Sequence, residues 1–140
     1  MKYLLDTCVI SEILKSNPNP KVVQWIGEKE EKTLFLSVLT IGEIWKGISK
    51  LPESKRKEEI LLWMQTDLRQ RFKKRILKFT EETAKIWGEI QGKAEKEGRK
   101  LPAIDSMLAA TAIFHHMILV TRNVLDIQTD RLTVINPWEI

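Results

Sequence analysis

The chain has 140 residues, 43% of them hydrophobic and 30% charged, which is typical of one globular domain and excludes a disordered chain. The 23 Lys and Arg against 19 Asp and Glu leave a net charge of +4, which suits a polyanionic substrate but is too small to indicate one. A single cysteine excludes an internal disulfide and argues against a cysteine-based zinc site.

No targeting or membrane segment is predicted. Asp6 interrupts the first apolar run before the apolar region of a signal peptide is complete. The longest apolar stretch, residues 107–114, is too short to span a bilayer. We therefore expect a cytoplasmic protein with no membrane partner.

Short apolar runs alternate with segments of helical spacing in the first half of the chain. A buried strand is expected to end at Asp6, followed by a tight turn and a helix that carries Val9, Ile10 and Ile13. In chain order there follow a turn at 16–20, a helix over 21–30, a buried strand over 34–38, a helix from Thr40 through Ile48, a break at 51–54 and a longer helix to about Arg71.

The second half continues the alternation. The expected elements are a short strand at 76–79, a helix that Thr80 or Glu81 opens and Gly98 ends, an alanine-rich helix from 101 to about 115, and strands at 118–121 and 132–135. Strands that alternate with helices predict an α/β fold with parallel pairing and right-handed crossovers.

Acidic and amide residues recur where strands are expected to end. Asp6 ends the first strand, and Glu43 and Asp105 lie in the predicted first turns of two helices. Asn123 follows the fourth clear strand, with Asp126 three residues later. In a doubly wound sheet these positions meet at the carboxyl edge of the strands, where ligands bind.

Each acid also has a purely structural explanation. Thr40-x-x-Glu43 matches a capping box, the helix dipole favours Asp105 in a first turn, and Asp6 can form an Asx-turn. Three acids at three matching topological positions favour a shared site instead. Clustered carboxylates need a counter-ion, and Mg²⁺ binds oxygen ligands while it keeps several waters. The pattern therefore predicts metal-assisted hydrolysis of a phosphodiester, in which the ion activates water.

Five short segments carry recognisable motifs. They are Leu4-Leu5-Asp6-Thr7-x-Val9-Ile10-Ser11-Glu12, Ser37-Val38-x-Thr40-x-x-Glu43, Ala103-x-Asp105-x-x-x-Ala109-Ala110-Thr111-Ala112, Val120-Thr121-Arg122-Asn123 and Asn136-Pro137-Trp138. Together they resemble PIN-domain proteins, and most of all the VapC/FitB-type toxins of prokaryotic toxin–antitoxin pairs. The segments occur in the family's order and spacing over nearly the whole chain.

The resemblance implies a Mg²⁺- or Mn²⁺-dependent endoribonuclease with a three-layer α/β/α sandwich. Residues 1–140 are expected to form a single PIN domain around a central parallel sheet of four to five strands. The resemblance also implies a homodimer and a cognate antitoxin that blocks the active site.

Carried over by position, the metal-binding acids of the family match Asp6, Glu43 and Asp105. The fourth acidic position falls at Asn123, whose amide oxygen can bind a hard cation but brings no charge. Asp126 is a candidate to compensate through water or as an outer group. Cys8 stands where many relatives have Asn, and we interpret it as a small buried side chain and not as a nucleophile.

Four further residues are candidates for supporting roles. Thr7 and Thr121 flank the acids, where their hydroxyls either orient a ligand or water or form ordinary strand-end turns. Lys46 and Arg122 lie close in sequence to the acids and are candidate contacts to RNA phosphates.

Other readings of the chain remain open. The main alternative is a catalytically weak or inactive PIN-fold module that binds RNA or protein, with Asn123 as the mark of lost activity. An Asp-nucleophile phosphatase requires a second Asp at position 8, and a Cys-phosphatase requires an Arg six residues after Cys8; neither is present. A flavodoxin-like cofactor binder is disfavoured because no glycine-rich loop follows the first strand.

Overall fold

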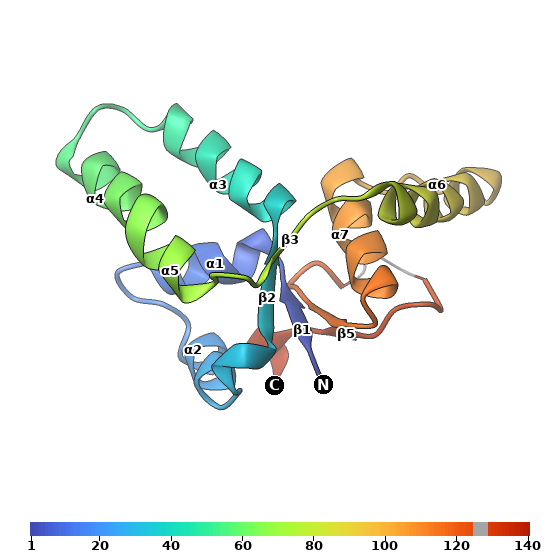
Figure 1. The fold of residues 1–140 in the computed structure, drawn as a ribbon, viewed down its shortest axis with the longest axis horizontal. Helices are drawn as coiled ribbons and strands as arrows, with labels where there is room; N and C mark the ends of the chain where they lie inside the picture. The colour runs from blue at the N-terminus through green and yellow to red at the C-terminus, as the bar shows by residue number, and fades with distance from the viewer. Residues whose placement is uncertain (125–128) are drawn as a thin grey trace.

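A parallel sheet runs through the middle of the molecule (Figure 1). The structure is a computed structural model, and it describes residues 1–124 and 129–140. Within these residues five strands pair in the order β3-β2-β1-β4-β5, every neighbouring pair parallel. The strands are β1 (Tyr3–Leu5), β2 (Leu34–Ser37), β3 (Ile76–Leu77), β4 (Ile118–Val120) and β5 (Val134–Ile135). The amino-terminal strand is thus the centre of the sheet.

Helices cover both faces of this sheet, because successive strand residues point to opposite sides. Leu5 and Val120 belong to a core with α1 (Thr7–Leu14), α2 (Pro20–Gly27), α3 (Val38–Lys50) and the segment that begins with α4 (Lys55–Trp63). Leu4 and Leu119 pack on the other face against α7 (Ala103–Phe114), which α6 (Glu81–Lys96) covers. The predicted three-layer α/β/α sandwich with a parallel sheet is confirmed.

The start of α3 differs from the sequence prediction. The helix begins at Val38, and its N-cap is Ser37, whose hydroxyl accepts the Leu39 N–H at 3.0 Å. Thr40 therefore lies inside the first turn, and Glu43 lies in the second turn. The predicted capping box between Thr40 and Glu43 is wrong, because an earlier hydroxyl already caps the helix.

Two further helices depart from the expected pattern. Pro20 is not part of the preceding turn but the first residue of α2, where its missing N–H costs nothing, and Asn19 caps the helix. The long helix expected after residue 54 contains a π-helical turn at Met64–Leu68 before α5 (Arg69–Arg71). There the Thr66 hydroxyl donates to the Leu62 carbonyl at 2.6 Å and competes with the regular backbone ladder.

The helices on the other face follow the predictions closely. Gly98 has φ +72, and the Arg99 N–H bonds to the Ala94 carbonyl at 2.8 Å, which completes the predicted left-handed end of α6. The alanine-rich α7 stops at Phe114, next to the predicted limit. The strands are shorter than predicted, and the last strand is followed by a 3-10 turn at Pro137–Glu139. None of the described helices has the length and apolar character needed to cross a membrane.

Substitution in the central strand tests this architecture. Leu4 is fully buried in β1, so Leu4→Ala should lower the free energy of unfolding by about 3 kcal/mol through lost burial and a residual cavity. Leu62, which is 63% exposed on α4, is the matched control. Leu62→Ala should change the free energy of unfolding by less than about 0.5 kcal/mol. Urea denaturation measures both values, and equal losses would contradict this layering.

Candidate active site

Asp6 lies at the carboxyl end of β1 and is 3% exposed. As the N-cap of α1, it accepts the Thr7 N–H on Oδ1 at 2.6 Å, and the Thr121 hydroxyl donates to Oδ2 at 2.6 Å. The Asp6 N–H in turn donates to the Val120 carbonyl at 2.9 Å. Asp6 thus caps α1 through the adjacent N–H and not through the N–H two residues on that the expected Asx-turn uses. The same carboxylate joins the ends of β1 and β4.

Glu43 reaches the same end of the sheet from α3. Its Oε1 accepts a short hydrogen bond from the Thr7 hydroxyl, which also lies 3.4 Å from the Thr40 hydroxyl. Thr7 thus contacts Asp6 through its backbone and Glu43 through its side chain. The structure therefore brings two of the predicted acids into one hydrogen-bonded group.

The segment after β4 joins this group through Thr121. The Thr121 hydroxyl, besides donating to Asp6, accepts the Asn123 N–H at 3.1 Å. The Cys8 sulfur lies 3.5 Å from Asp6 Oδ2 and accepts the Arg122 N–H at 3.5 Å. The side chain of Asn123 is exposed beside these contacts. Asp126 falls outside the described residues.

Asp105 is placed by the direction of α7. Only three residues lie between the end of that helix and the start of β4, so the helix runs back along the sheet and its first turn points toward the carboxyl edge (Figure 1). Ile104 packs on the same apolar cluster as Leu39 from the first turn of α3. Asp105 is half-buried in that first turn, as predicted. Within residues 1–124 and 129–140, however, no three acidic, cysteine or histidine side chains lie close enough together to hold a metal ion.

The electrostatics of Cys8 exclude a thiolate at neutral pH. Burial and the nearby negative charge of Asp6 raise the pKa of Cys8 to about 11, although the Arg122 N–H and the Thr121 hydroxyl act in the opposite direction. The thiol is half-buried against the apolar core. This agrees with the interpretation of Cys8 as a small packing residue.

The two predicted basic contacts are exposed. Lys46 lies on the solvent side of α3, about one turn after Glu43. Arg122 follows Thr121 directly, and its guanidinium carbon lies 5.3 Å from the centre of the Trp138 ring. Both residues are therefore accessible to a ligand that approaches the acids.

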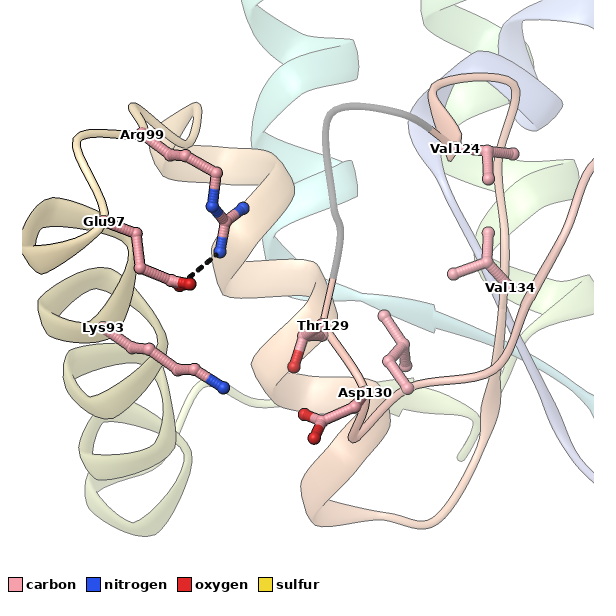
Figure 2. A pocket seen from close by; sticks show the side chains of 8 residues that line it. Lys93, Glu97, Arg99, Val124, Thr129, Asp130 and Val134 are labelled. Carbon is pink, nitrogen blue, oxygen red and sulfur yellow. Dashed lines mark hydrogen bonds and ion pairs between the residues drawn. The ribbon is translucent and has the colours of Figure 1, made fainter.

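A hollow of about 640 Å³ lies away from Asp6 and Glu43, between α6 and residues 129–134 (Figure 2). Lys93 and Arg99 line it together with Glu97 and Asp130, and Arg99 pairs with Glu97 at 3.1 Å. None of the predicted site residues is among its described lining residues. Its size does not make it the functional site, because its charges are mixed and it lacks the acid group.

Three residues at or near this edge were missed from the sequence. Thr40 is fully buried and meets Thr7, but the capping-box pattern concealed this role. Glu12 is only 5% exposed, although an acid between apolar helix residues is normally placed outside. Trp138 belongs to the terminal motif, but the sequence does not indicate its contact with Arg122.

Comparison with known proteins identifies the family of the chain. A family profile described as "PIN domain" matches residues 3–124. The chain belongs to the PIN-domain family. It is 30% identical to the VapC ribonuclease Y4jK of Sinorhizobium fredii and 34% identical to the toxin FitB of Neisseria gonorrhoeae, and each match covers at least 96% of both chains. The crystal structure of FitAcB from Neisseria gonorrhoeae superposes with a TM-score of 0.93 at 33% identity over 99% of each chain. The predicted resemblance to VapC/FitB-type proteins is thereby confirmed.

The raised pKa of Cys8 predicts slow alkylation and an alkaline loss of stability. At pH 8 a shift from 9.0 to about 11 lowers the thiolate fraction by about 100-fold, so iodoacetamide should react about 100-fold more slowly with the folded than with the urea-unfolded chain. Because the pKa is higher in the folded state, the free energy of unfolding should fall as pH rises from about 9 to 11. Mass spectrometry and urea titrations measure the two effects. Cys8→Ala is the control and should abolish both.

Proposed function

We propose that the chain is a metal-dependent endoribonuclease and the toxin half of a toxin–antitoxin pair, acting on RNA in the cytoplasm. The observation that carries this proposal is the hydrogen-bonded group of Asp6 and Glu43 at the carboxyl end of β1. The names of two full-length relatives, a VapC ribonuclease and the toxin FitB, support the activity and the toxin role.

The donor set fits a hard divalent cation such as Mg²⁺ or Mn²⁺. Asp6, Glu43 and Asp105 offer carboxylate oxygens, and Asn123 offers an amide oxygen, at one edge of the sheet. Such ions retain several waters, so they do not require three carboxylates in direct mutual contact. When bound, the ion would supply Lewis-acid stabilisation of phosphoryl charge and a lower pKa for water.

The chain's own groups would orient these ligands. The Thr121 hydroxyl and the Thr7 N–H hold the two oxygens of Asp6, and the Thr7 hydroxyl holds Glu43. Fixed supporting hydrogen bonds of this kind preserve the direction of ligand lone pairs. Thr7 and Thr121 thus support the ligands, Asp126 is proposed as an outer group that acts through water, and Lys46 and Arg122 would contact RNA phosphates.

The proposal includes the partners that the relatives suggest. The cognate antitoxin would cover the acid edge, by which we mean the carboxyl edge of the sheet with Asp6, Glu43, Asp105 and Asn123. The chain would form a homodimer. Residues 1–140 would act as one PIN domain, since β5 and the turn after it complete the sheet and its packing beyond the profile match.

Replacement of two acids tests the site. Asp6→Asn and Asp105→Asn should each reduce RNA cleavage by at least about 100-fold, because Asn removes the charge. The fold should be kept, since Asn is close to Asp in size and at position 6 remains a good N-cap. The measurement is cleavage of a mixed RNA substrate by purified, antitoxin-free protein in Mn²⁺, in Mg²⁺ and in EDTA. Circular dichroism monitors folding.

Asp67 is an exposed acid in the π-helical turn. Asp67→Asn is therefore the matched control and should retain full activity. Metal-dependent cleavage that survives in both Asp6→Asn and Asp105→Asn would reject the assignment. RNA binding that persists in EDTA without any cleavage in Mn²⁺ would favour the binding-module alternative. In that case Asn123→Asp tests whether the missing charge has disabled the site.

A further inference from the structure

Arg122 stands at the acid edge on a fixed backbone. Its N–H donates to the Cys8 sulfur at 3.5 Å, and its neighbours Thr121 and Asn123 belong to the hydrogen-bonded group around Asp6. The side chain is exposed, and it forms no salt bridge with any residue that the structure describes. The guanidinium donors are thus not consumed by a carboxylate of the described chain.

The guanidinium rests on an aromatic ring that is itself held in place. The centre of the Trp138 ring lies 5.3 Å from the Arg122 guanidinium carbon, and the ring packs on the apolar core. The backbone N–H of Trp138 donates to the Asn136 side chain at 2.9 Å. The turn that carries Trp138 packs against α2. A cation over an indole face is attracted by the ring quadrupole, and this attraction restricts the long Arg side chain.

A buried acid, Glu12, lies near Trp138. The carboxylate of Glu12 accepts the Lys15 ammonium at 2.9 Å and the Asn19 N–H at 3.0 Å. The contacts with Lys15 and Asn19 lower the pKa of Glu12, and the nearby Trp138 side chain acts in the same direction, so the carboxyl is ionised at neutral pH. The Trp138 ring thus packs on the apolar core and also lies close to the guanidinium of Arg122.

We propose that Trp138, held against the apolar core, is a positioning residue that presents Arg122 to an RNA phosphate next to the hydrogen-bonded group of Asp6 and Glu43. The inference rests on the proposed ribonuclease function and assigns its substrate contact. A cation–π contact uses no hydrogen-bond acceptor, so the guanidinium N–H donors remain available for a bidentate phosphate contact. Because the side chain is ordered before RNA binds, less conformational entropy is lost on binding.

The test is a double-mutant cycle on RNA affinity. In an Asp105→Asn background, Arg122→Ala should raise the Kd for a labelled single-stranded RNA about 5-fold and reduce the salt slope by about 0.7, the value for one phosphate contact. Trp138→Ala should raise the Kd about 3-fold, and the double variant should bind no more weakly than Arg122→Ala alone. In the otherwise wild-type chain with Mn²⁺, Arg122→Ala and Trp138→Ala should raise KM and leave kcat nearly unchanged.

Lys29→Ala is the matched control. Lys29 also lies over aromatic rings, 5.0 Å from the Trp25 centre and 5.5 Å from the Tyr3 centre, but at the opposite end of β1. Lys29→Ala removes one positive charge, as Arg122→Ala does, and should leave the Kd for RNA within about twofold of the value without this substitution. Trp138→Phe keeps an aromatic face, should fold if Trp138→Ala does not, and should rescue most of the affinity.

The outcomes separate the two proposals. If the wild-type chain cleaves RNA, but Arg122→Ala and Trp138→Ala bind it with wild-type Kd, only this inference is overturned. Additive losses in the double variant would also overturn it, because Trp138 would then act independently of Arg122. If the wild-type chain neither binds nor cleaves RNA, the proposed function fails and this inference fails with it.

Discussion

The hydrogen bonding of one buried carboxylate governs the acid edge of this protein. A carboxylate removed from water is costly unless its oxygens are satisfied, and Asp6 is satisfied by the Thr7 N–H and the Thr121 hydroxyl. These two donors come from the start of α1 and the end of β4. Through the hydroxyl of Thr7 the same group extends to Glu43 on α3. Asp6, Thr7, Thr121 and Glu43 thus form one connected group, in which the contacts of the buried Asp6 carboxylate are central.

The groups that support these acids are neutral. The contacts of Asp6 and Glu43 come from threonine hydroxyls, a backbone N–H and a thiol whose raised pKa, about 11, keeps it protonated. Neutral donors orient carboxylates without cancelling their charge, so the edge keeps its attraction for a cation. The cations nearby in sequence, Lys46 and Arg122, are exposed instead. The carboxylates proposed to bind a cation are thus distinct from the two cationic side chains proposed to contact phosphate.

The sequence predicted the elements whose signals are local and strong. Apolar runs ended by Asp6 and Val120 indicated parallel strands, and Gly98 indicated the end of α6. The start of α3 was misjudged because two hydroxyl residues compete to cap it, and only packing selects Ser37. The contact between Trp138 and Arg122 joins the end of the chain to the segment after β4, which no local pattern reveals. Contacts between distant segments therefore determine the features that local sequence propensity does not predict.

The central position of β1 has a consequence for folding. The hydrogen bond from Thr121 to Asp6 joins residues 115 positions apart, and β1 pairs with both β2 and β4. Closing so large a loop costs chain entropy before any contact compensates it, which places this step late and slows folding. A chain that has folded only its first half lacks the second donor to Asp6. The acid edge is therefore completed only when the two halves of the molecule have come together.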